Sequence, residues 1–462
     1  MSETSALMPF DLLITGAALI GVGPDLATLD SGVIGIRGTR IAYVGATRPA
    51  GVQARRTLHL PGRIVCPGFI NMHYHAGLNF VRGVAPDLGF APSYTAGLPQ
   101  ASQLTPEEAA ALSRLGALEA LKSGCTTVVD SFVHAGAIAD GMASLGGRLF
   151  LSQRLNDVDF ASVIQGPRRF DAELGARMLS QAEAFVARWH GAGDGRIQAH
   201  LTAHAPDTCS RQFLLDVAAL ARRHGLRLST HLAQSQVEVD WVRATHGCSP
   251  VRWLDELGLL DDRLLAGHCI HVDEDDIARL GRSGAHVVHI PLGNAVSGRF
   301  APTHALAAAG ASIVLATDTM HGDMIEAMRW ALAVGRIQEG RVSDRWQPRS
   351  VLAMATRDAA RALGQGDVLG TLAPGHAADL AIIDARQAHL TPCIDPLGVL
   401  VHNGVGADVD MVIVAGRCVI ENGRAVLVDE DAVLAEAERA VRAVWSRCPH
   451  PLRPYPPVRT AA

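Results

Sequence analysis

Eight short apolar runs alternate with stretches of helical character between residues 63 and 321, and this repeat restricts the fold more than any other feature. Buried parallel strands separated by helices form βαβ units, and eight such units close into a barrel. The runs cover residues 63–75, 125–133, 147–155, 196–208, 226–235, 263–273, 285–294 and 312–321. The pattern therefore predicts an α/β fold whose centre is a (β/α)8 TIM-like barrel.

Both ends of the chain show a different pattern. Residues 11–66 and 368–428 contain short β-like segments separated by glycines, and neither stretch alone has enough strands to enclose a core. We expect the two stretches to pair as one small composite β-sandwich. The predicted domains are 1–66 with 369–430 as the β-sandwich, 67–368 as the barrel, and 431–462 as a C-terminal helix followed by a Pro-rich tail.

Composition excludes several classes of protein. The chain has 41 basic and 46 acidic residues, a net charge of −5, and no basic block, which argues against nucleic acid as the main partner. No apolar run approaches the ~18 residues needed to span a membrane. The first basic residue is Arg37, and the eight cysteines form no CxxC pair. We therefore expect a reduced, cytoplasmic protein without a targeting segment.

Most of the apolar runs end in His, Asp or Asn, at positions that line the C-terminal face of a barrel, where active sites of this fold lie. His73 and His75 are two residues apart at the end of the first run, so both imidazoles face the same side of a strand. Among 20 histidines in 462 residues, about one such pair is expected by chance, so alone it also fits a purely structural pair.

Three residues at the ends of other runs strengthen the case for a metal site. His231, His268 and Asp318 would all converge on the barrel mouth together with the first pair. Imidazoles and a carboxylate suit Zn²⁺, or Fe²⁺, with one coordination position left for water. A divalent ion lowers the pKa of such a water to about 7.

Several motifs occur in the order and spacing of a known superfamily. They are "VCPGFINMHYH", "TAHAPDTCS", "STHLAQS", "GHCIHVD", "HIPLGNAVSG", "ATDT" and "LGTLAPGHAADLAIID". The chain resembles the amidohydrolase superfamily over about residues 10–428. It looks like the cytosine-deaminase-like branch, which holds triazine hydrolases (chlorohydrolases), guanine deaminase and adenosylhomocysteine deaminase. The resemblance implies a (β/α)8 barrel beside a composite β-sandwich, and a homo-oligomer.

The resemblance also implies roles for individual residues. The metal ligands would be His73, His75, His231 and Asp318. His268 would orient the water or polarise the substrate and, with Asp318, carry the catalysis. His204 matches a position that contacts substrate in related enzymes, although a strand-end histidine bonded to a backbone carbonyl is the alternative. His321, on the last βα loop, is a further candidate for substrate contact, whereas His271 and His289 are interpreted as structural.

The single lysine bears on the number of metal ions. Binuclear members of the superfamily bridge two metals with a carbamylated lysine at the end of the fourth strand. Here the run at 196–208 contains no lysine, and Lys122 precedes the second strand. The sequence therefore predicts a mononuclear site.

One position departs from the deaminases of the family, which carry a proton-transferring glutamate three residues after the strand-5 histidine. Here that residue is Gln234, whose neutral amide can bind substrate but cannot act as an acid or base. Glu238 lies nearby, on the following helix, and we expect it to face solvent. His268 and Asp318 then handle the protons, or the leaving group needs no ring protonation, or the barrel binds metal without catalysis.

The predicted function is a metal-dependent hydrolase that deaminates a small N-heterocycle or cyclic amidine, with water activated at the metal attacking an sp² ring carbon. The alternatives are a hydrolytic dechlorinase or desulfurase, a cyclic-amide hydrolase, or a non-enzymatic metal-binding scaffold. The loop at residues 82–108 lacks the Trp and Glu that adenosylhomocysteine deaminases use to hold a ribose, which disfavours a nucleoside substrate.

Overall fold

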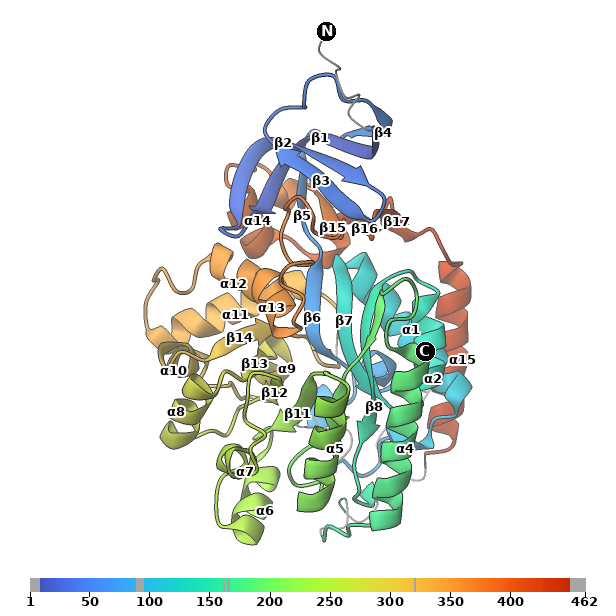
Figure 1. The fold of residues 1–462 in the computed structure, drawn as a ribbon, viewed down its shortest axis with the longest axis vertical. Helices are drawn as coiled ribbons and strands as arrows, with labels where there is room; N and C mark the ends of the chain where they lie inside the picture. The colour runs from blue at the N-terminus through green and yellow to red at the C-terminus, as the bar shows by residue number, and fades with distance from the viewer. Residues whose placement is uncertain (1–8, 89–94, 161–162, 164–166, 320, 449–462) are drawn as a thin grey trace, which may run out of the picture.

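The computed structural model describes residues 9–88, 95–160, 163, 167–319 and 321–448, and the predicted architecture is confirmed (Figure 1). A parallel barrel forms the body of the molecule, and a sheet built from both ends of the chain lies at one end of it. The Pro-rich tail predicted at the C-terminus and part of the 82–108 loop lie outside the described residues.

The barrel strands follow one another around the sheet in chain order, all parallel. They are β6 (Phe69–Tyr74), β7 (Cys125–Phe132), β8 (Arg148–Leu155), β9 (Ile197–Ala199), β10 (Leu201–Ala203), β11 (Leu228–Leu232), β12 (Leu264–His268), β13 (His286–His289) and β14 (Ser312–Leu315). The strands β9 and β10 pair with β8 on either side of His200 and together occupy the fourth strand position. The eight predicted runs thus correspond to eight positions in the barrel.

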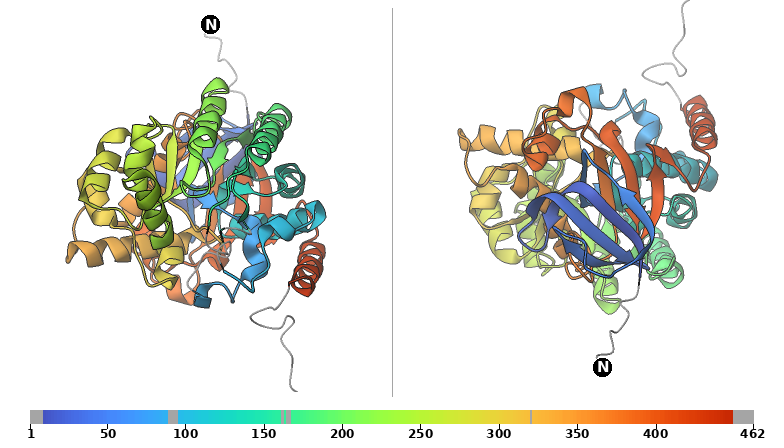
Figure 2. Two further views of the ribbon diagram at one scale, coloured as in Figure 1. Left: turned by 90° about the horizontal axis from the view of Figure 1, so that it is seen from below. Right: turned by 90° about the horizontal axis from the view of Figure 1, so that it is seen from above.

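Helices surround the strands, as the view from below shows (Figure 2, left). They are α1 (Pro106–Lys122), α2 (Ala135–Ala143), α4 (Ala172–Trp189), α5 (Arg211–Arg223), α6 (Gln236–His246), α7 (Pro250–Glu256), α8 (Glu274–Ser283), α9 (Pro291–Val296), α10 (Thr303–Ala308), α11 (Met324–Glu339), α12 (Pro348–Ala355) and α13 (Arg357–Ala362). At the start of α1, Thr105 and Glu108 form a reciprocal capping box.

The barrel closes where its first and last strands meet. The N–H of His75 donates to the carbonyl of Asp318 at 3.0 Å, and the N–H of Asp318 donates to the carbonyl of His73 at 3.0 Å. Two residues before His73 on β6, the side chain of Asn71 forms hydrogen bonds with both the hydroxyl and the N–H of Thr317. This β6–β14 seam places three of the predicted site residues on adjacent backbone.

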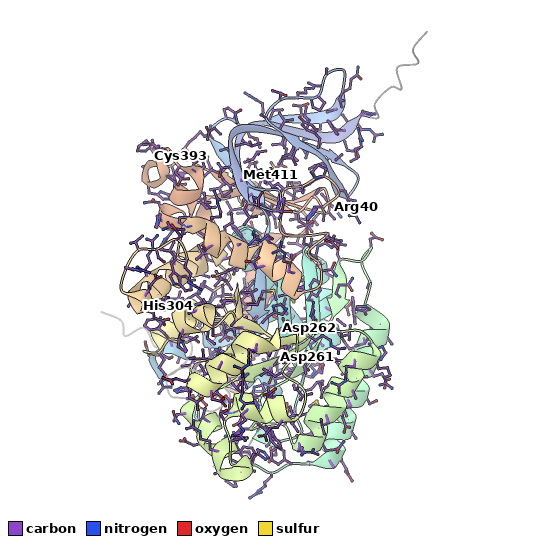
Figure 3. The ribbon with its side chains drawn as sticks, turned by 60° about the vertical axis from the view of Figure 1, so that its left-hand side comes forward. Arg40, Asp261, Asp262, His304, Cys393 and Met411 are labelled. Atoms are coloured by element: carbon purple, nitrogen blue, oxygen red, sulfur yellow. The ribbon has the colours of Figure 1, made fainter. Side chains whose placement is uncertain are left out.

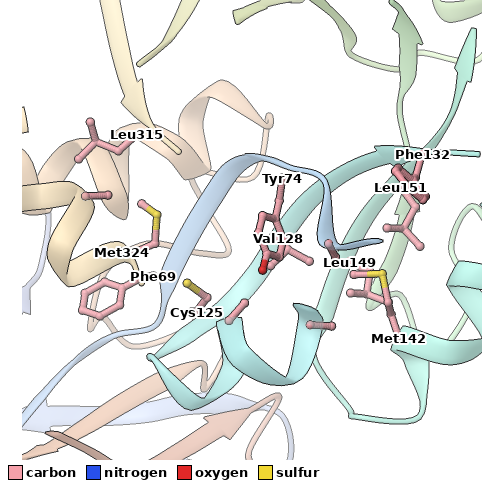
Figure 4. Close-up of a cluster of buried hydrophobic side chains, with 14 of the residues drawn as sticks. Phe69, Tyr74, Cys125, Val128, Phe132, Met142, Leu149, Leu151, Leu315 and Met324 are labelled. Carbon is pink, nitrogen blue, oxygen red and sulfur yellow. The ribbon is translucent and has the colours of Figure 1, made fainter. Parts of the chain in front are cut away.

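Apolar side chains fill both sides of the barrel wall. The interior holds Ile70, Met72, Val129, Phe150, Leu265, Val288 and Val314. The outer face of β6 to β8 packs under helices, and Tyr74 and Val128 both belong to that buried cluster (Figure 4). The Tyr74 hydroxyl donates to the carbonyl of Gly116 in α1, which satisfies its polar end.

The second sheet joins the two ends of the chain, as predicted. Its strands are β1 (Phe10–Val22), β2 (Ala27–Arg37), β3 (Arg40–Gly45), β4 (Ala54–His59), β5 (Arg63–Pro67), β15 (Leu380–Asp384), β16 (Val409–Val414), β17 (Arg417–Glu421) and β18 (Arg424–Ala425). β5 pairs antiparallel with β15, which links the halves, and Ile14, Ile34 and Ile413 share one core between them. Met411 lies on that core and Arg40 at its edge, where Arg40 bonds the carbonyl of Gly375 (Figure 3). The view from above shows the N-terminal strands lying across the C-terminal ones (Figure 2, right).

The first predicted run divides between the two sheets. Residues 63–67 form β5 of the end sheet, and residues 69–74 form β6 of the barrel. Gly68 lies between them, where a Cβ atom would come within 2.1 Å of the Thr126 side chain. A continuous apolar run conceals this change because both segments are buried.

The chain continues through α14 (Pro396–Asn403) and the last strands of the end sheet to the C-terminal helix α15 (Glu430–Ser446). This helix packs against α1. Lys122 donates to Glu430 at 2.5 Å, and the indole N–H of Trp445 donates to the carbonyl of Phe80. The lone lysine is therefore part of a helix–helix contact. Among the described residues, no helix has both the length and the apolar character needed to cross a membrane.

Candidate metal centre

Four imidazoles and one carboxylate meet at the C-terminal mouth of the barrel. His73 is on β6 and His75 follows it, His231 is on β11, His268 ends β12, and Asp318 follows β14. All five are buried, none more than 7% exposed. Candidate ligand atoms of His73, His231 and His268 lie within 4.8 Å of one another, and so do those of His73, His75 and Asp318. The strand ends predicted to converge do converge.

Backbone carbonyls orient two of these rings. Nδ1 of His75 lies 2.9 Å from the carbonyl oxygen of Ser131, and Nδ1 of His231 lies 2.7 Å from that of His204. A carbonyl can only accept, so both Nδ1 atoms carry hydrogen and both Nε2 atoms present lone pairs. Those two Nε2 atoms are 3.3 Å apart. Two facing lone pairs at this distance repel unless a cation lies between or beside them.

The carboxylate of Asp318 completes the cluster. Its oxygens lie 3.7 Å from His73 Nε2, 3.6 Å from His75 Nε2 and 4.0 Å from His268 Nε2. Burial raises the pKa of Asp318 to about 8. Its backbone has a φ of +67°, an unusual conformation that the β6–β14 hydrogen bonds hold in place.

Burial also keeps the histidines neutral. It lowers the pKa of His75 to about 3, helped by the nearby His231, and that of His231 to about 4. The pKa values of His73 and His268 also lie well below 6.5, for the same first cause. Neutral imidazole is the form that ligates metal.

His268 has a partner that sequence reasoning did not identify. Its Nδ1 donates to Oδ1 of Asn294, a buried residue of α9, at 3.1 Å, which directs Nε2 towards Asp318. The signal was present, because Asn294 ends one of the apolar runs. The carbonyl of Ser131 that orients His75 left no such signal, since any residue supplies a carbonyl.

The three predicted substrate-contact residues have different surroundings. The ring of His204 is 4.9 Å from that of His231, and its Nδ1 bonds the hydroxyl of Thr208 at 2.8 Å. Gln234 is partly buried on the loop after β11. His321 accepts from the N–H of Asp323 at 3.2 Å, and its Nε2 is buried without a partner among the described residues. Only His204 makes a ring contact with the cluster in the described part of the chain.

The prediction for Glu238 was wrong. This residue is 2% exposed, and its carboxylate accepts from the N–H groups of Ala233 at 2.7 Å and Gln234 at 2.8 Å. The helix turns this face inward because two main-chain donors need an acceptor. Burial and the nearby Asp207 raise the pKa of Glu238, whereas the hydrogen bonds from Gln234 and Ala233 lower it.

The donor set fits a divalent metal ion. Nε2 of His73 and of His268 are buried and lack hydrogen-bond partners among the described residues. A buried polar atom without a partner is costly, and a bound cation would satisfy both together with the facing pair of His75 and His231. Lys122 is committed to Glu430 on the outer helices, so it supplies no ligand here.

Comparisons with known proteins agree with this geometry. A 5-methylthioadenosine/S-adenosylhomocysteine deaminase from Desulforudis audaxviator (strain MP104C) is 35% identical over 441 residues, 93% of this chain and 98% of that protein. An adenosine deaminase from Xanthomonas campestris, solved with bound zinc, superposes with a TM-score of 0.83 at 25% identity, over 95% of this chain and 99% of that one.

A second solved structure shows the same fold at lower identity. Atrazine chlorohydrolase from Arthrobacter aurescens TC1, complexed with zinc, has a TM-score of 0.83 and 23% identity, covering 93% of this chain and all of that one. The family model described as the amidohydrolase family matches residues 64–419. On the strength of this match and of the relatives, the chain belongs to the amidohydrolase family.

Proposed function

We propose that this protein is a divalent-metal-dependent hydrolase that releases ammonia from an amino-substituted N-heterocycle of the adenine type. The observation that carries the proposal is the convergence of four neutral imidazoles and a buried carboxylate at the barrel mouth. Similarity to deaminases of adenosine-type nucleosides supports the substrate class, in spite of the missing Trp and Glu in the 82–108 loop.

His73, His75, His231 and Asp318 would hold a single ion, with Zn²⁺ favoured over Fe²⁺ by the zinc in a related structure. When bound, the ion supplies Lewis acidity and lowers the pKa of water. Lys122 lies away from the site, which supports one ion rather than a bridged pair.

The remaining steps fall to the chain's own groups. Asp318 would accept a proton from the attacking water, because its carboxylate oxygens face the imidazoles of the cluster. His268, whose Nδ1 is bonded to Asn294, keeps Nε2 directed at the reacting centre and would stabilise charge that develops on the ring. Water adds to the ring carbon, the C–N bond breaks, and ammonia leaves with the transferred protons.

The test is a screen of the zinc-loaded protein for ammonia release from adenosine, 5-methylthioadenosine, S-adenosylhomocysteine, aminopyrimidines, pterins and aminotriazines. Metal content is measured in parallel by elemental analysis. The His73→Ala variant should lose both metal and activity, whereas His59→Ala, an exposed histidine of the end sheet, should keep both. Zinc-free protein without activity on any substrate would contradict the proposal and favour a scaffold.

Gln234 favours a second candidate function. An amide in place of the glutamate cannot protonate a ring nitrogen, so a leaving group that departs as an anion is the natural alternative. Chloride or thiolate release from substituted triazines or pyrimidines would then exceed ammonia release. Measuring both products on matched chloro- and amino-substituted rings separates the two functions.

A further inference from the structure

The N-terminus of α6 differs from the reciprocal capping boxes that begin α1 and α8. In α1, Glu108, the third helical residue, accepts from the N–H of the N-cap residue Thr105 at 2.9 Å. In α8, Asp276 accepts in the same way from its N-cap residue Asp273. Glu238 occupies the equivalent position in α6, but its carboxylate reaches one and two residues further back, to Gln234 and Ala233.

Ala233 connects this carboxylate to the next barrel strand. Its carbonyl accepts from the N–H groups of Ile270 at 3.1 Å and His271 at 2.9 Å, in the loop that follows β12. The adjacent carbonyl of Leu232 accepts from the N–H of Cys269 at 3.0 Å. Three hydrogen bonds thus join the end of β11, which carries His231, to the end of β12, which carries His268.

The joined segments have an unfavourable backbone. Ala233 has a φ of +48°, His268 of +71° and Cys269 of +50°. Residues with a side chain adopt this left-handed conformation at a cost, and it persists only where surrounding contacts impose it. The Glu238 carboxylate provides such a contact, because it accepts from the N–H of Ala233 itself and from the N–H of the next residue, Gln234.

We propose that Glu238 is a positioning residue that fixes the ends of β11 and β12, and through them the placement of His231, Gln234 and His268 around the metal. The expected effect of Glu238 on catalysis rests on the proposed function, whereas its expected effect on metal affinity does not. Glu238 acts through the main chain of Ala233 and touches no ligand itself.

The experiment compares variants by their affinity for Co²⁺, measured by competition with a chelator, and by the visible spectrum of the Co²⁺-loaded protein. In Glu238→Gln, the amide keeps the shape but loses one acceptor, so one main-chain N–H faces a second donor. Glu108→Gln is the matched control, with the same change at the same helical position away from the site. Ser235→Ala removes the N-cap acceptor of α6 but leaves the Glu238 contacts to Ala233 and Gln234 intact.

We expect Glu238→Gln to weaken Co²⁺ binding roughly 10- to 100-fold, the usual effect of removing a group that orients metal ligands, and to change the Co²⁺ absorption bands. Both controls should lower thermal stability without altering either metal readout. Adding Ala233→Gly to Glu238→Gln should restore part of the affinity, because glycine adopts the left-handed conformation without strain. This double variant also serves if Glu238→Gln alone folds poorly.

Unchanged Co²⁺ affinity and spectrum in Glu238→Gln, or equal losses in Ser235→Ala, would overturn the proposal. On any heterocycle that the wild-type protein deaminates, kcat should fall more than KM rises. If the wild-type protein deaminates nothing, the proposed function fails, and the metal measurements still decide the role of Glu238.

Discussion

Replacing Asp318 with asparagine should stabilise the metal-free protein while it destroys the metal site. Burial raises the pKa of this carboxyl from its usual 3.8 to about 8. At pH 7 the unfolded chain carries an ionised Asp318, whereas the metal-free folded state holds it protonated. Unfolding therefore releases a proton from Asp318, and the free energy of unfolding falls as the pH rises from about 4 towards 8.

The size of the effect follows from the pKa. At pH 7 the penalty amounts to roughly 4 kcal/mol, and it grows by about 1.4 kcal/mol for each pH unit between pH 5 and pH 7. Asparagine does not titrate, so Asp318→Asn should remove most of this penalty. The histidines of the cluster titrate in both proteins, and their contributions cancel in the comparison.

The assay is urea denaturation of chelator-treated wild type and Asp318→Asn at pH 5, 6 and 7, followed by repetition with zinc. Without metal, the variant should be more stable, by a margin that widens with pH. With zinc, the wild type should gain far more stability than the variant, because ligand binding to the folded state adds to its free energy of unfolding. A variant that is less stable at pH 7, or a margin independent of pH, would refute the reasoning.

Three further outcomes are expected. Gln234→Glu should raise the rate of ammonia release on the order of 100-fold if the missing acid limits deamination, and no gain in kcat would place proton transfer elsewhere. Burial lowers the pKa of His200 and of His289 to about 3, so both stay neutral in the folded protein, and stability should fall as the pH drops below about 6.5. Each should cost about 2 kcal/mol at pH 5, and the chelator-treated variants His200→Gln and His289→Gln should show a flatter pH dependence in urea denaturation. Lys122→Met should destabilise the α1–α15 contact by about 1–3 kcal/mol in thermal or urea unfolding, since Glu430 is buried, while zinc content stays unchanged.

The sequence predicted those features that depend on a repeated pattern or on side chains at strand ends. The barrel, the sheet from both chain ends and the convergence of His73, His75 and Asp318 all followed from apolar periodicity and from where it stops. Gly68 was invisible to that argument, because a buried strand of the end sheet and a buried strand of the barrel have the same composition.

Hydrogen bonds between side chains and the main chain were the other feature that the sequence did not predict. Glu238 resembles any glutamate on an exposed helical face, and only the turn at Ala233 shows why its carboxylate points inward. The Ser131 carbonyl that orients His75 is equally undetectable in a sequence, because every residue has one. Apolar periodicity predicts which side chains are buried, but it does not predict which backbone N–H groups they accept from.

The β6–β14 seam has a consequence for how the protein is made. His73 and His75 leave the ribosome early, whereas Asp318 emerges only after all the other barrel strands. A nascent chain therefore offers a metal ion two imidazoles long before the carboxylate that completes the set. Once β14 pairs with β6, an ion bound by His73, His75 and Asp318 would bridge the first and last strands of the barrel. Separating these two strands would then require releasing the ion first.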